Sequence, residues 1–406
     1  MIHRIAIQNF YCMRDRVEIN LAVSGQVPEA PERFGQFSSE SSIRIPRVVG
    51  LFGPNASGKS TILRVLSFIN WFIQEGFSLP PKQEIPCFRF SSKKMLEQPV
   101  VIELDFDAPV DLTEGGEGPR CPYFYKIVMG GGGASPAHIE SEELFYAPPN
   151  AARRVRVFER GKDGIEHGAR AFKLEGYTRA IPKVVRPNVS LISTLAQLGH
   201  EPSIALREIA GGIETNLFYE LHNLPVQYIA QTYMSDKRLL ADLKREISKL
   251  DLGITEVQVN KPASERAYPE PKFTHRGLSE AMSFQRESEG TRQFFKIFPM
   301  LSRALHNGGV AVVDEFDSSL HPLILPEIIG WFYNPKRNSK GAQLWFTGQN
   351  PYVMNELPKE SILFCQKDAN GSASVFGLSD VRAVRRNDNF VKKYLGGQFG
   401  AVPHIG

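Results

Sequence analysis

The stretch RVVGLFGPNASGKST, residues 47–61, decides the fold expected for this chain. Its first six residues are a short apolar run of the kind that forms a buried strand. A glycine-rich turn follows, and apolar residues then recur at helical spacing as far as Phe72. The turn fits the phosphate-binding pattern G-x-x-x-x-G-K-[S/T] in its required setting between a strand and a helix. The sequence therefore predicts a nucleotide-binding α/β domain.

The chemistry of a phosphate cradle assigns roles within this loop. Backbone N–H groups of the loop and of the helix start can bind the α- and β-phosphates, and the two glycines permit a close approach or a positive φ. Lys59 can reach the β- and γ-phosphates, and the Ser60 hydroxyl can hold Mg²⁺. ATP and Mg²⁺ are the expected cofactors. The candidate nucleotide-binding residues of the loop are Gly53, Asn55, Ala56, Ser57, Gly58, Lys59, Ser60 and Thr61.

A second stretch, GVAVVDEFD at residues 309–317, supplies the carboxylates that such a site needs. Its apolar run ends in Asp314, which is expected to bind Mg²⁺ together with Ser60, directly or through water. Glu315 is placed to polarise the attacking water and is a candidate catalytic residue. For Asp317 two interpretations stay open, a solvated carboxylate and a loop residue of the site.

Composition narrows the class of protein. The chain has 406 residues, 42% of them hydrophobic and 23% charged, as in an ordinary globular protein. Its net charge of +4 gives no global electrostatic argument for nucleic acid or membrane binding. The four cysteines show no paired spacing, and no run of 18 apolar residues occurs. We therefore expect a cytoplasmic protein without a disulfide framework or membrane contact.

Two basic segments leave alternatives open. Residues 151–190 hold ten basic and four acidic residues, and a shorter basic stretch covers residues 382–393. Each is either a solvated charged face or a contact for a polyanion or another subunit.

Several motifs together resemble the ABC and SMC class of ATPases. Besides the acid pair at 314–315, SEGTRQ at residues 288–293 matches the signature loop of that class, and SSLHP at residues 318–322 matches its D-loop. The text IAIQNFYCMRDRVEINL, residues 5–21, is similar to the opening of SMC-like and RecF-like ATPases. The resemblance implies an α/β P-loop ATPase head with an antiparallel β subdomain and a short helical insertion.

The resemblance also implies an organisation of the chain. Residues 1–97 would form the N-terminal half of the head with the P-loop, residues 98–195 a β-rich subdomain, residues 196–276 a helical insertion and linker, and residues 277–406 the C-terminal half. Apolar spacing predicts helices over residues 203–222 and 231–250, and the composition of residues 259–276 favours a loop. No heptad pattern lasts three or four repeats, so no long coiled coil is expected.

More narrowly, five segments resemble the ATPases of bacterial anti-phage systems, namely the RloA and AbiL abortive-infection type and the PARIS ATPase. This resemblance implies control of a separate toxic effector, a TOPRIM-type nuclease, in response to a phage-derived trigger. Fewer than 60 residues follow FTGQN, too few for a TOPRIM domain, which also suggests a separate chain. The segments are IPCFRF at 85–90, FTHRGL at 273–278, SEGT at 288–291, DEFDSSLHP at 314–322 and KYLGGQFGAVPHI at 393–405.

In ABC-type enzymes ATP is sandwiched between the P-loop of one protomer and the signature loop of another. A homo-oligomer is therefore implied, in which Ser288 and Gly290 contact the γ-phosphate bound to the other copy. The alternative for SEGT is an ordinary helix cap.

One position departs from the resemblance. Relatives carry a switch histidine in text like TTHN, whereas this chain reads FTGQN and places Gln349 there. Glutamine can donate a hydrogen bond to the γ-phosphate but cannot take a proton, so slow hydrolysis is expected, with Gln349 as a second candidate catalytic residue. His321 is either a substitute or a structural residue, and Gln83 is either the Q-loop residue or an ordinary surface glutamine.

Two other functions compete with the defence ATPase. A RecF-like DNA-repair clamp would bind nucleic acid directly and would need a basic face such as residues 151–190. A transporter ATPase subunit ranks lowest, because the β-rich insertion and the long distance from Ser60 to Ser288 are unlike compact transporter subunits.

Overall fold

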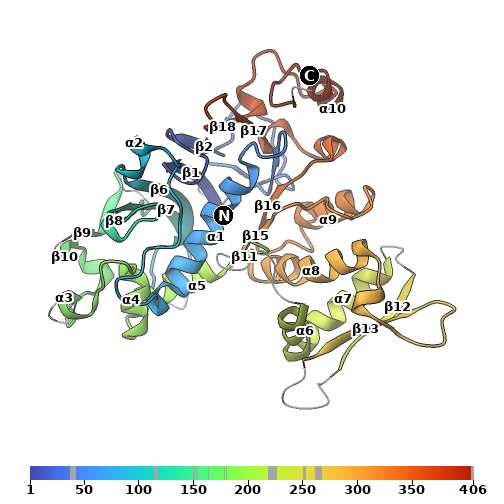
Figure 1. The fold of residues 1–406 in the computed structure, drawn as a ribbon, viewed down its shortest axis with the longest axis horizontal. Coiled ribbons are helices and arrows are strands. Elements are labelled where there is room, and N and C mark those ends of the chain that lie inside the picture. The colour runs from blue at the N-terminus through green and yellow to red at the C-terminus, as the bar shows by residue number, and fades with distance from the viewer. Residues whose placement is uncertain are drawn as a thin grey trace.

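The computed structural model describes residues 1–36, 43–113, 118–149, 151, 153–162, 164–177, 179, 181–217, 226–249, 253–260 and 268–403. Helix α1 (Lys59–Gln74) lies between two large sheets, and its apolar side chains join both of them in one core. Figure 1 shows this helix running through the middle of the molecule, with the antiparallel sheet on one side.

The mainly parallel sheet carries the P-loop. Its inner strands are buried from end to end because both faces are covered, as the apolar run at residues 47–52 predicts. Alternate residues point to opposite sides, so that Val49 and Leu51 join the core around α1 while Val48 and Phe52 join the second core. In sheet order the strands are β11 (Ile213–Thr215), β15 (Val310–Val313), β16 (Gln343–Thr347), β5 (Val48–Phe52), β17 (Ile362–Lys367) and the antiparallel β18 (Ala373–Gly377).

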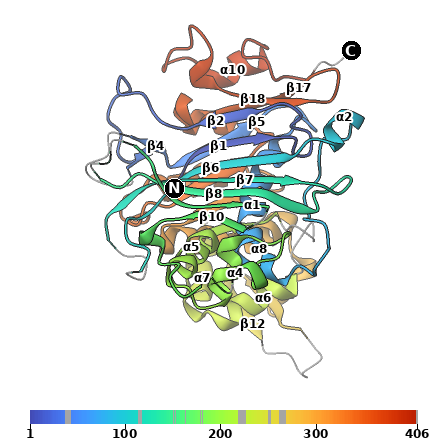
Figure 2. The ribbon, with the colours of Figure 1, turned by 90° about the vertical axis from the view of Figure 1, so that its left-hand side faces the viewer.

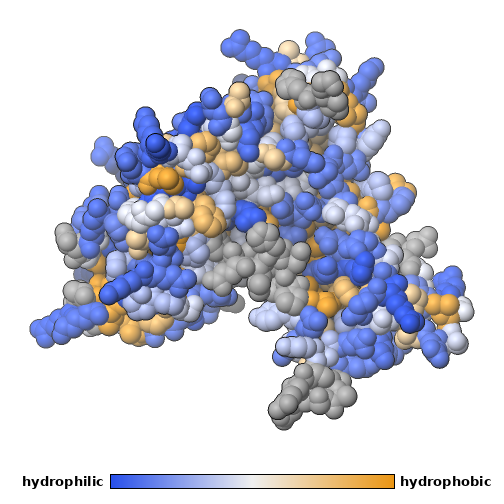
Figure 3. Space-filling model, in the orientation of Figure 1, coloured by the Kyte–Doolittle hydropathy of each residue, from blue (hydrophilic) through white to orange (hydrophobic). Residues whose placement is uncertain are grey.

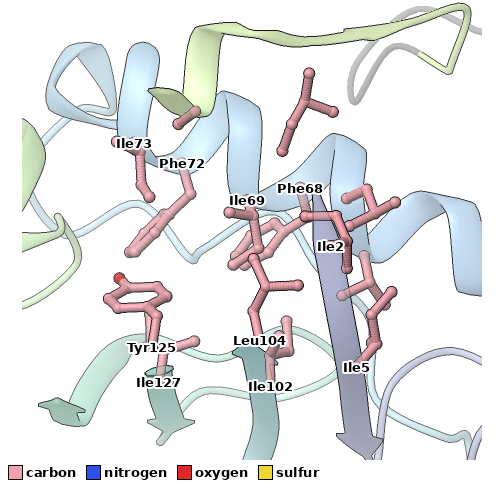
Figure 4. Packing of buried hydrophobic residues seen from close by; sticks show 14 of the residues in the cluster. Ile2, Ile5, Phe68, Ile69, Phe72, Ile73, Ile102, Leu104, Tyr125 and Ile127 are labelled. Carbon is pink, nitrogen blue, oxygen red and sulfur yellow. The ribbon is translucent and has the colours of Figure 1, made fainter. Parts of the chain in front are cut away.

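The seven-stranded antiparallel sheet includes an N-terminal hairpin of β1 and β2 and is seen face-on in Figure 2. Phe72 and Ile69 of α1 point toward Leu104 and Tyr125 of this sheet (Figure 4), and all four are buried. In sheet order the strands are β10 (Gly164–Gly168), β9 (Val155–Gly161), β8 (His138–Tyr146), β7 (Arg120–Gly130), β6 (Val100–Pro109), β1 (Ile2–Gln8) and β2 (Val17–Asn20).

Helices α8 (Glu289–Asn307) and α9 (Ile324–Tyr333) cover the other face of the parallel sheet and form the second core. Beside α8 lies a small unit of two helices and three strands. It consists of α6 (Val226–Ser235), α7 (Lys237–Lys249), β12 (Ile254–Asn260), β13 (Glu270–His275) and β14 (Met282–Ser283). The remaining elements are β3 (Phe34–Gly35), β4 (Ile45–Pro46), α2 (Lys93–Leu96), α3 (Ile181–Val184), α4 (Leu191–Gln197), α5 (Glu201–Gly211) and α10 (Phe390–Leu395).

The expected fold class is confirmed. A P-loop sheet, an antiparallel β subdomain and a short helical insertion are all present, and the longest helix in the described ranges, α8, has 19 residues. No long coiled coil occurs among those residues. Nor does any helix of the described part have both the length and the apolar character needed to cross a membrane. On the side shown in Figure 3, the surface is mainly hydrophilic with small hydrophobic patches.

Two local predictions are wrong. The helix expected over residues 203–222 ends at Gly211, because residues 213–215 form β11 and pair in parallel with β15. Residues 218–222 of that prediction lie outside the described residues. The loop expected over residues 259–276 contains strand β13, which pairs with β12 and buries Phe273 in the second core. In both places, strand pairing overrides the local pattern: the partner of β11 is distant in sequence, whereas the partner of β13 is the preceding strand.

Candidate nucleotide-binding site

The P-loop connects the end of β5 to the start of α1. Gly53 has a φ of 143°, Gly58 a φ of 103°, and Ala56 also lies in the left-handed region with a φ of 61°. A Cβ on Gly53 would stand 2.2 Å from the carbonyl oxygen of Cys365, so only glycine fits there. Asn55 and Ala56 are exposed at the tip of the loop. The loop therefore has the shape that the sequence predicts.

Polar groups of the loop are left available for an anion. The ammonium group of Lys59 donates to the carbonyl oxygens of Gly53 at 2.9 Å and Pro54 at 2.8 Å, and burial lowers the pKa of this lysine. The Ser57 hydroxyl is buried and has no hydrogen-bond partner among the described residues. Phosphate oxygens can replace both carbonyls at Lys59, and they are stronger acceptors because they are charged. This arrangement fits a bound triphosphate.

Asp314 lies where three elements meet. The Ser60 hydroxyl at the start of α1 donates to Oδ1 of Asp314 at 2.9 Å, and the Thr347 hydroxyl at the end of β16 donates to the same oxygen at 2.6 Å. The structure thus brings together the two residues predicted to bind the metal, although they are 254 positions apart. Hydroxyl and carboxylate oxygens are the ligands that Mg²⁺ prefers, so Ser60 and Asp314 fit this ion.

Asn216 fixes the backbone of Asp314 and was missed by the sequence analysis. Its Nδ2 donates to the carbonyl oxygen of Asp314 at 2.9 Å, and the Asp314 N–H donates to its Oδ1 at 2.8 Å. Asn216 directly follows β11, so it reaches Asp314 from the neighbouring parallel strand. Gln83, the earlier candidate for the Q-loop, lies elsewhere, since its carbonyl oxygen accepts from Asn188. The available signal was a polar residue after the stretch Ile213–Thr215, two of whose three residues are β-branched, but the apolar spacing predicts a helix there.

Glu315 is exposed and held by its backbone. Its φ of 51° lies in the left-handed region, which costs a residue with a side chain about 1–3 kcal/mol. Its N–H donates to the Thr347 hydroxyl at 2.8 Å, so one threonine positions both members of the acid pair. Such strain at an exposed carboxylate is common at functional sites. Thr347 was also missed, although it ends a strand whose residues were quoted.

Asp317 and His321 have structural partners. Oδ2 of Asp317 accepts the backbone N–H groups of Gln349, at 2.6 Å, and of Asn350. Asp317 therefore closes the loop after β16 and is not merely solvated, while the Gln349 side chain is exposed. His321 accepts the backbone N–H of Leu323 through Nδ1 at 3.3 Å, which favours its interpretation as a structural residue.

A cavity of about 540 Å³ opens beside the P-loop. Loop residues from Ala56 to Thr61 line it on one side, and Tyr11 and Phe88 line it on the other. These two rings lie edge to face, 5.5 Å apart, and 52% of Phe88 is exposed. A volume of this size suits a nucleotide, and aromatic walls next to a phosphate cradle suit a base.

The signature residues lie on a separate part of the surface. Ser288 is the N-cap of α8, and its hydroxyl accepts the Thr291 N–H at 3.1 Å, so SEGT does form a helix cap. Gly290 packs on the D-loop, where a Cβ would stand 2.7 Å from the carbonyl oxygen of Ser319. Ser288 is exposed, and within the described part of the chain no hydrogen bond joins Ser288 or Gly290 to the P-loop. A γ-phosphate contact by either residue stays a prediction.

Four of the ten basic residues at 151–190 form ion pairs with carboxylates of the described residues. Arg154 pairs with Asp105 at 2.7 Å, Arg156 with Glu159 at 2.6 Å, Lys162 with Glu140 at 3.7 Å and buried Arg160 with Glu142 at 3.3 Å, and Arg186 donates to carbonyl oxygens. In the C-terminal stretch, Arg386 pairs with Glu360 at 2.7 Å and Lys393 with Asp388 at 2.6 Å. These contacts favour a structural role for the side chains that they join, and both interpretations stay open for the other basic residues of the two segments.

A family model matches part of the chain. Residues 217–355 match the family described as "AAA domain, putative AbiEii toxin, Type IV TA system". The match includes the signature stretch and the acid pair but covers less than half of the chain and leaves out the P-loop. No curated protein matches.

Solved SMC head structures align with most of the chain. The head domain from Thermotoga maritima is 14% identical, covers 93% of this chain and 98% of its own, and has a TM-score of 0.41. An SMC head bound to the C-winged helix domain of ScpA is 13% identical, covers 92% of this chain and 97% of its own, and has a TM-score of 0.47. A head from Pyrococcus furiosus, bound to the C-terminal domain of ScpA, is 13% identical, covers 93% of this chain and 96% of its own, and has a TM-score of 0.44. These TM-scores are low, and the fold is shown by the sheet order of this chain itself.

The phosphate cradle, the acid pair beside it and the matched AAA family all indicate the same general activity. This chain has the features of a nucleotide-binding P-loop ATPase.

Proposed function

We propose that this protein is an ATPase that works as a closed assembly of copies, in which the P-loop of one copy and the signature residues of another hold the same ATP. One observation carries the proposal. The P-loop half of the site is preassembled around Asp314, whereas Ser288 and Gly290 are presented elsewhere on the surface. An exposed helix N-terminus is a suitable site for the γ-phosphate of a nucleotide held by another molecule.

Each part of the nucleotide would meet a matching part of the cavity. The phosphates would lie on the loop amides and Lys59, and the base would lie against Tyr11 and Phe88. Ser60 and Asp314 would hold Mg²⁺, which supplies charge neutralisation at the phosphates. These contacts lie within one copy, so a single copy binds ATP without completing the site.

Hydrolysis would depend on Glu315 and Gln349. Glu315 is exposed beside Asp314 and would accept a proton from the attacking water. Gln349 would donate a hydrogen bond to the γ-phosphate, but it cannot relay a proton. Turnover would therefore be slow, and the ATP-bound assembly would persist.

The biological role that we propose is anti-phage defence of the abortive-infection type in the cytoplasm. A phage-derived trigger would change the assembly and release a separate toxic effector of the TOPRIM nuclease type. The motif resemblance supports this role, and so does the toxin–antitoxin wording in the description of the matched family. A stable complex with an effector encoded nearby is expected at low salt, and failure of the two to co-purify would reject the partner.

The test uses Glu315→Gln, which is expected to bind ATP but not to hydrolyse it. With ATP and Mg²⁺, the mass of the particle in solution should be that of a dimer or a larger oligomer. Without ATP, it should be that of a monomer. A thiol introduced at Ser288 should then cross-link only to a thiol introduced at Ser57 of another copy. If the trapped protein stays a monomer at saturating ATP, the proposal is wrong.

A RecF-like DNA-binding ATPase is the competing function. It would be favoured if the purified protein alone bound duplex DNA tightly, in an ATP-dependent way, with an affinity that falls steeply with salt. Four of the ten basic residues at 151–190 already pair with carboxylates of this chain, which leaves fewer positive charges for a duplex.

A further inference from the structure

Among the described residues, a hydrogen bond connects the signature loop to the insertion unit (α6, α7, β12, β13 and β14). His275, the last residue of β13, contacts Oε1 of Glu287 through Nε2 at 2.7 Å. The Glu287 side chain is only 2% exposed, and Glu287 immediately precedes Ser288. The residue that precedes the N-cap of α8 is therefore hydrogen-bonded to a strand of the insertion unit.

The same loop packs on an aromatic cluster of the insertion unit and α8. Phe284, three residues before Glu287, lies 5.5 Å from Phe295 of α8 and 6.4 Å from Phe273 of β13. Tyr233 of α6 lies 4.6 Å from Phe295 and donates its hydroxyl to the carbonyl oxygen of that residue at 2.9 Å. Figure 1 shows α6, α7, β12 and β13 gathered next to α8, at the end of the molecule away from the antiparallel sheet.

The His275 contact is expected to hold the loop firmly. A buried carboxylate that loses its hydrogen-bonding partner must either take up a proton or turn toward solvent. Since Glu287 is joined to Ser288 by one peptide bond, its movement would change the position of the Ser288 hydroxyl and the first amides of α8. The P-loop, on β5 and α1, would be unaffected, because none of the residues described above contacts it.

We propose that His275 is a positioning residue, which orients the signature loop through Glu287 for contact with a nucleotide on another copy. This inference rests on the proposed composite site. It gives the insertion unit a role, because movement of β13 is transmitted to the part of the site that a single copy cannot complete. A ligand on the insertion unit would then change ATP-dependent assembly without touching the nucleotide.

The experiment compares His275→Ala with His275→Gln in the Glu315→Gln background. His275→Ala should raise the ATP concentration at half-maximal assembly about tenfold or more, the expected loss for a hydrogen bond to a buried charge. The affinity of the isolated copy for a fluorescent ATP analogue should change less than about twofold. His275→Gln keeps an N–H donor and should restore assembly. His306→Ala is the matched control, since exposed His306 contacts Arg238 near the opposite end of α8.

A second readout does not require assembly, and it compares variants of equal melting temperature, so that a folding defect is recognised. A thiol introduced at Ser288 should be labelled faster with His275→Ala than with the parent or with His275→Gln, at equal melting temperature. Unchanged assembly and labelling in a folded His275→Ala protein would overturn the inference, as would failure of His275→Gln to restore either. Absence of assembly in the Glu315→Gln parent would reject the composite site, and the labelling rates would then decide the positioning role.

Discussion

The two halves of the proposed ATPase site differ in how much of their environment one chain supplies. On the P-loop side, Lys59 is buried, and Asp314 accepts two hydroxyl hydrogen bonds while Asn216 pairs with its backbone. On the signature side, Ser288 is exposed and bonds only within its own helix turn among the described residues. The P-loop half is organised before a nucleotide binds. The signature half exposes a hydroxyl and helix N-terminal amides that, among the described residues, contact no phosphate-binding group of the same chain.

The difference follows from where each half lies in the fold. Neighbouring parallel strands end at the same edge of the sheet, so the sheet itself gathers Gly53, Asp314, Asn216 and Thr347. The signature residues begin a helix that packs on the other face of the sheet, and their position depends on the insertion unit. Variants in the two halves should therefore separate ATP binding from assembly.

The largest effect is expected from Lys59→Ala, which removes charged contacts to the phosphates from the preassembled half. Affinity for ATP should fall about 100-fold or more, because each charge-assisted hydrogen bond contributes about 1.5–3 kcal/mol. Titration with a fluorescent ATP analogue measures the loss. Exposed Lys336 gives the control variant Lys336→Ala, which should bind normally. Equal affinity of Lys59→Ala and the parent would contradict the assignment of the loop.

Gly290→Ala should break the other half. The added Cβ would stand 2.7 Å from the Ser319 carbonyl oxygen, so the D-loop or the start of α8 must shift. We expect assembly with ATP to weaken about tenfold while ATP binding by the single copy stays unchanged. Sedimentation of the Glu315→Gln background measures assembly. Gly330→Ala in α9 is the control, since a Cβ there meets nothing within 4 Å. A parallel loss of ATP binding would show that the halves are not separate.

Asn216→Ala tests the edge of the sheet that the sequence analysis missed. Without this side chain, the N–H and carbonyl groups of Asp314 lose their partners, which should cost about 1–3 kcal/mol of unfolding free energy. The Mg²⁺ concentration needed for half-maximal hydrolysis should also rise. Asn70→Ala removes a hydrogen bond to Ile213 of the same strand and should leave the Mg²⁺ requirement unchanged. An identical Mg²⁺ dependence in both variants would reject the positioning role of Asn216.

The smallest change is expected from Gln349→His. A histidine at this exposed position can take up a proton that glutamine cannot, so kcat should rise about threefold, below the full effect of a general base. Steady-state phosphate release measures it, with Gln398→His as a surface control. An unchanged or lower kcat would mean that this glutamine does not limit turnover.

Residue patterns were sufficient for the P-loop, the acid pair and the strands that carry them, because each is encoded in a short continuous stretch. They were insufficient for Asn216, which follows a strand of three residues. The residue pattern predicts a helix there, whereas the helix ends at Gly211. Strand β13 was likewise expected as a loop, and the contact of His275 with Glu287 was therefore not predicted. In both cases the strand exists through pairing with another strand, β15 for β11 and β12 for β13, and the pattern of its own residues does not show this pairing.

By itself, the sequence determined which groups could bind a phosphate and a metal, since glycine, lysine, hydroxyl and carboxylate chemistry is a property of the residues. Only the tertiary structure decided which of these groups meet. It brought Ser60 to Asp314 across 254 positions and left Ser288 exposed and bonded within its own helix turn. The physical reason is that sheet order and helix packing set distances between side chains, and these depend on burial of the whole core rather than on any local motif.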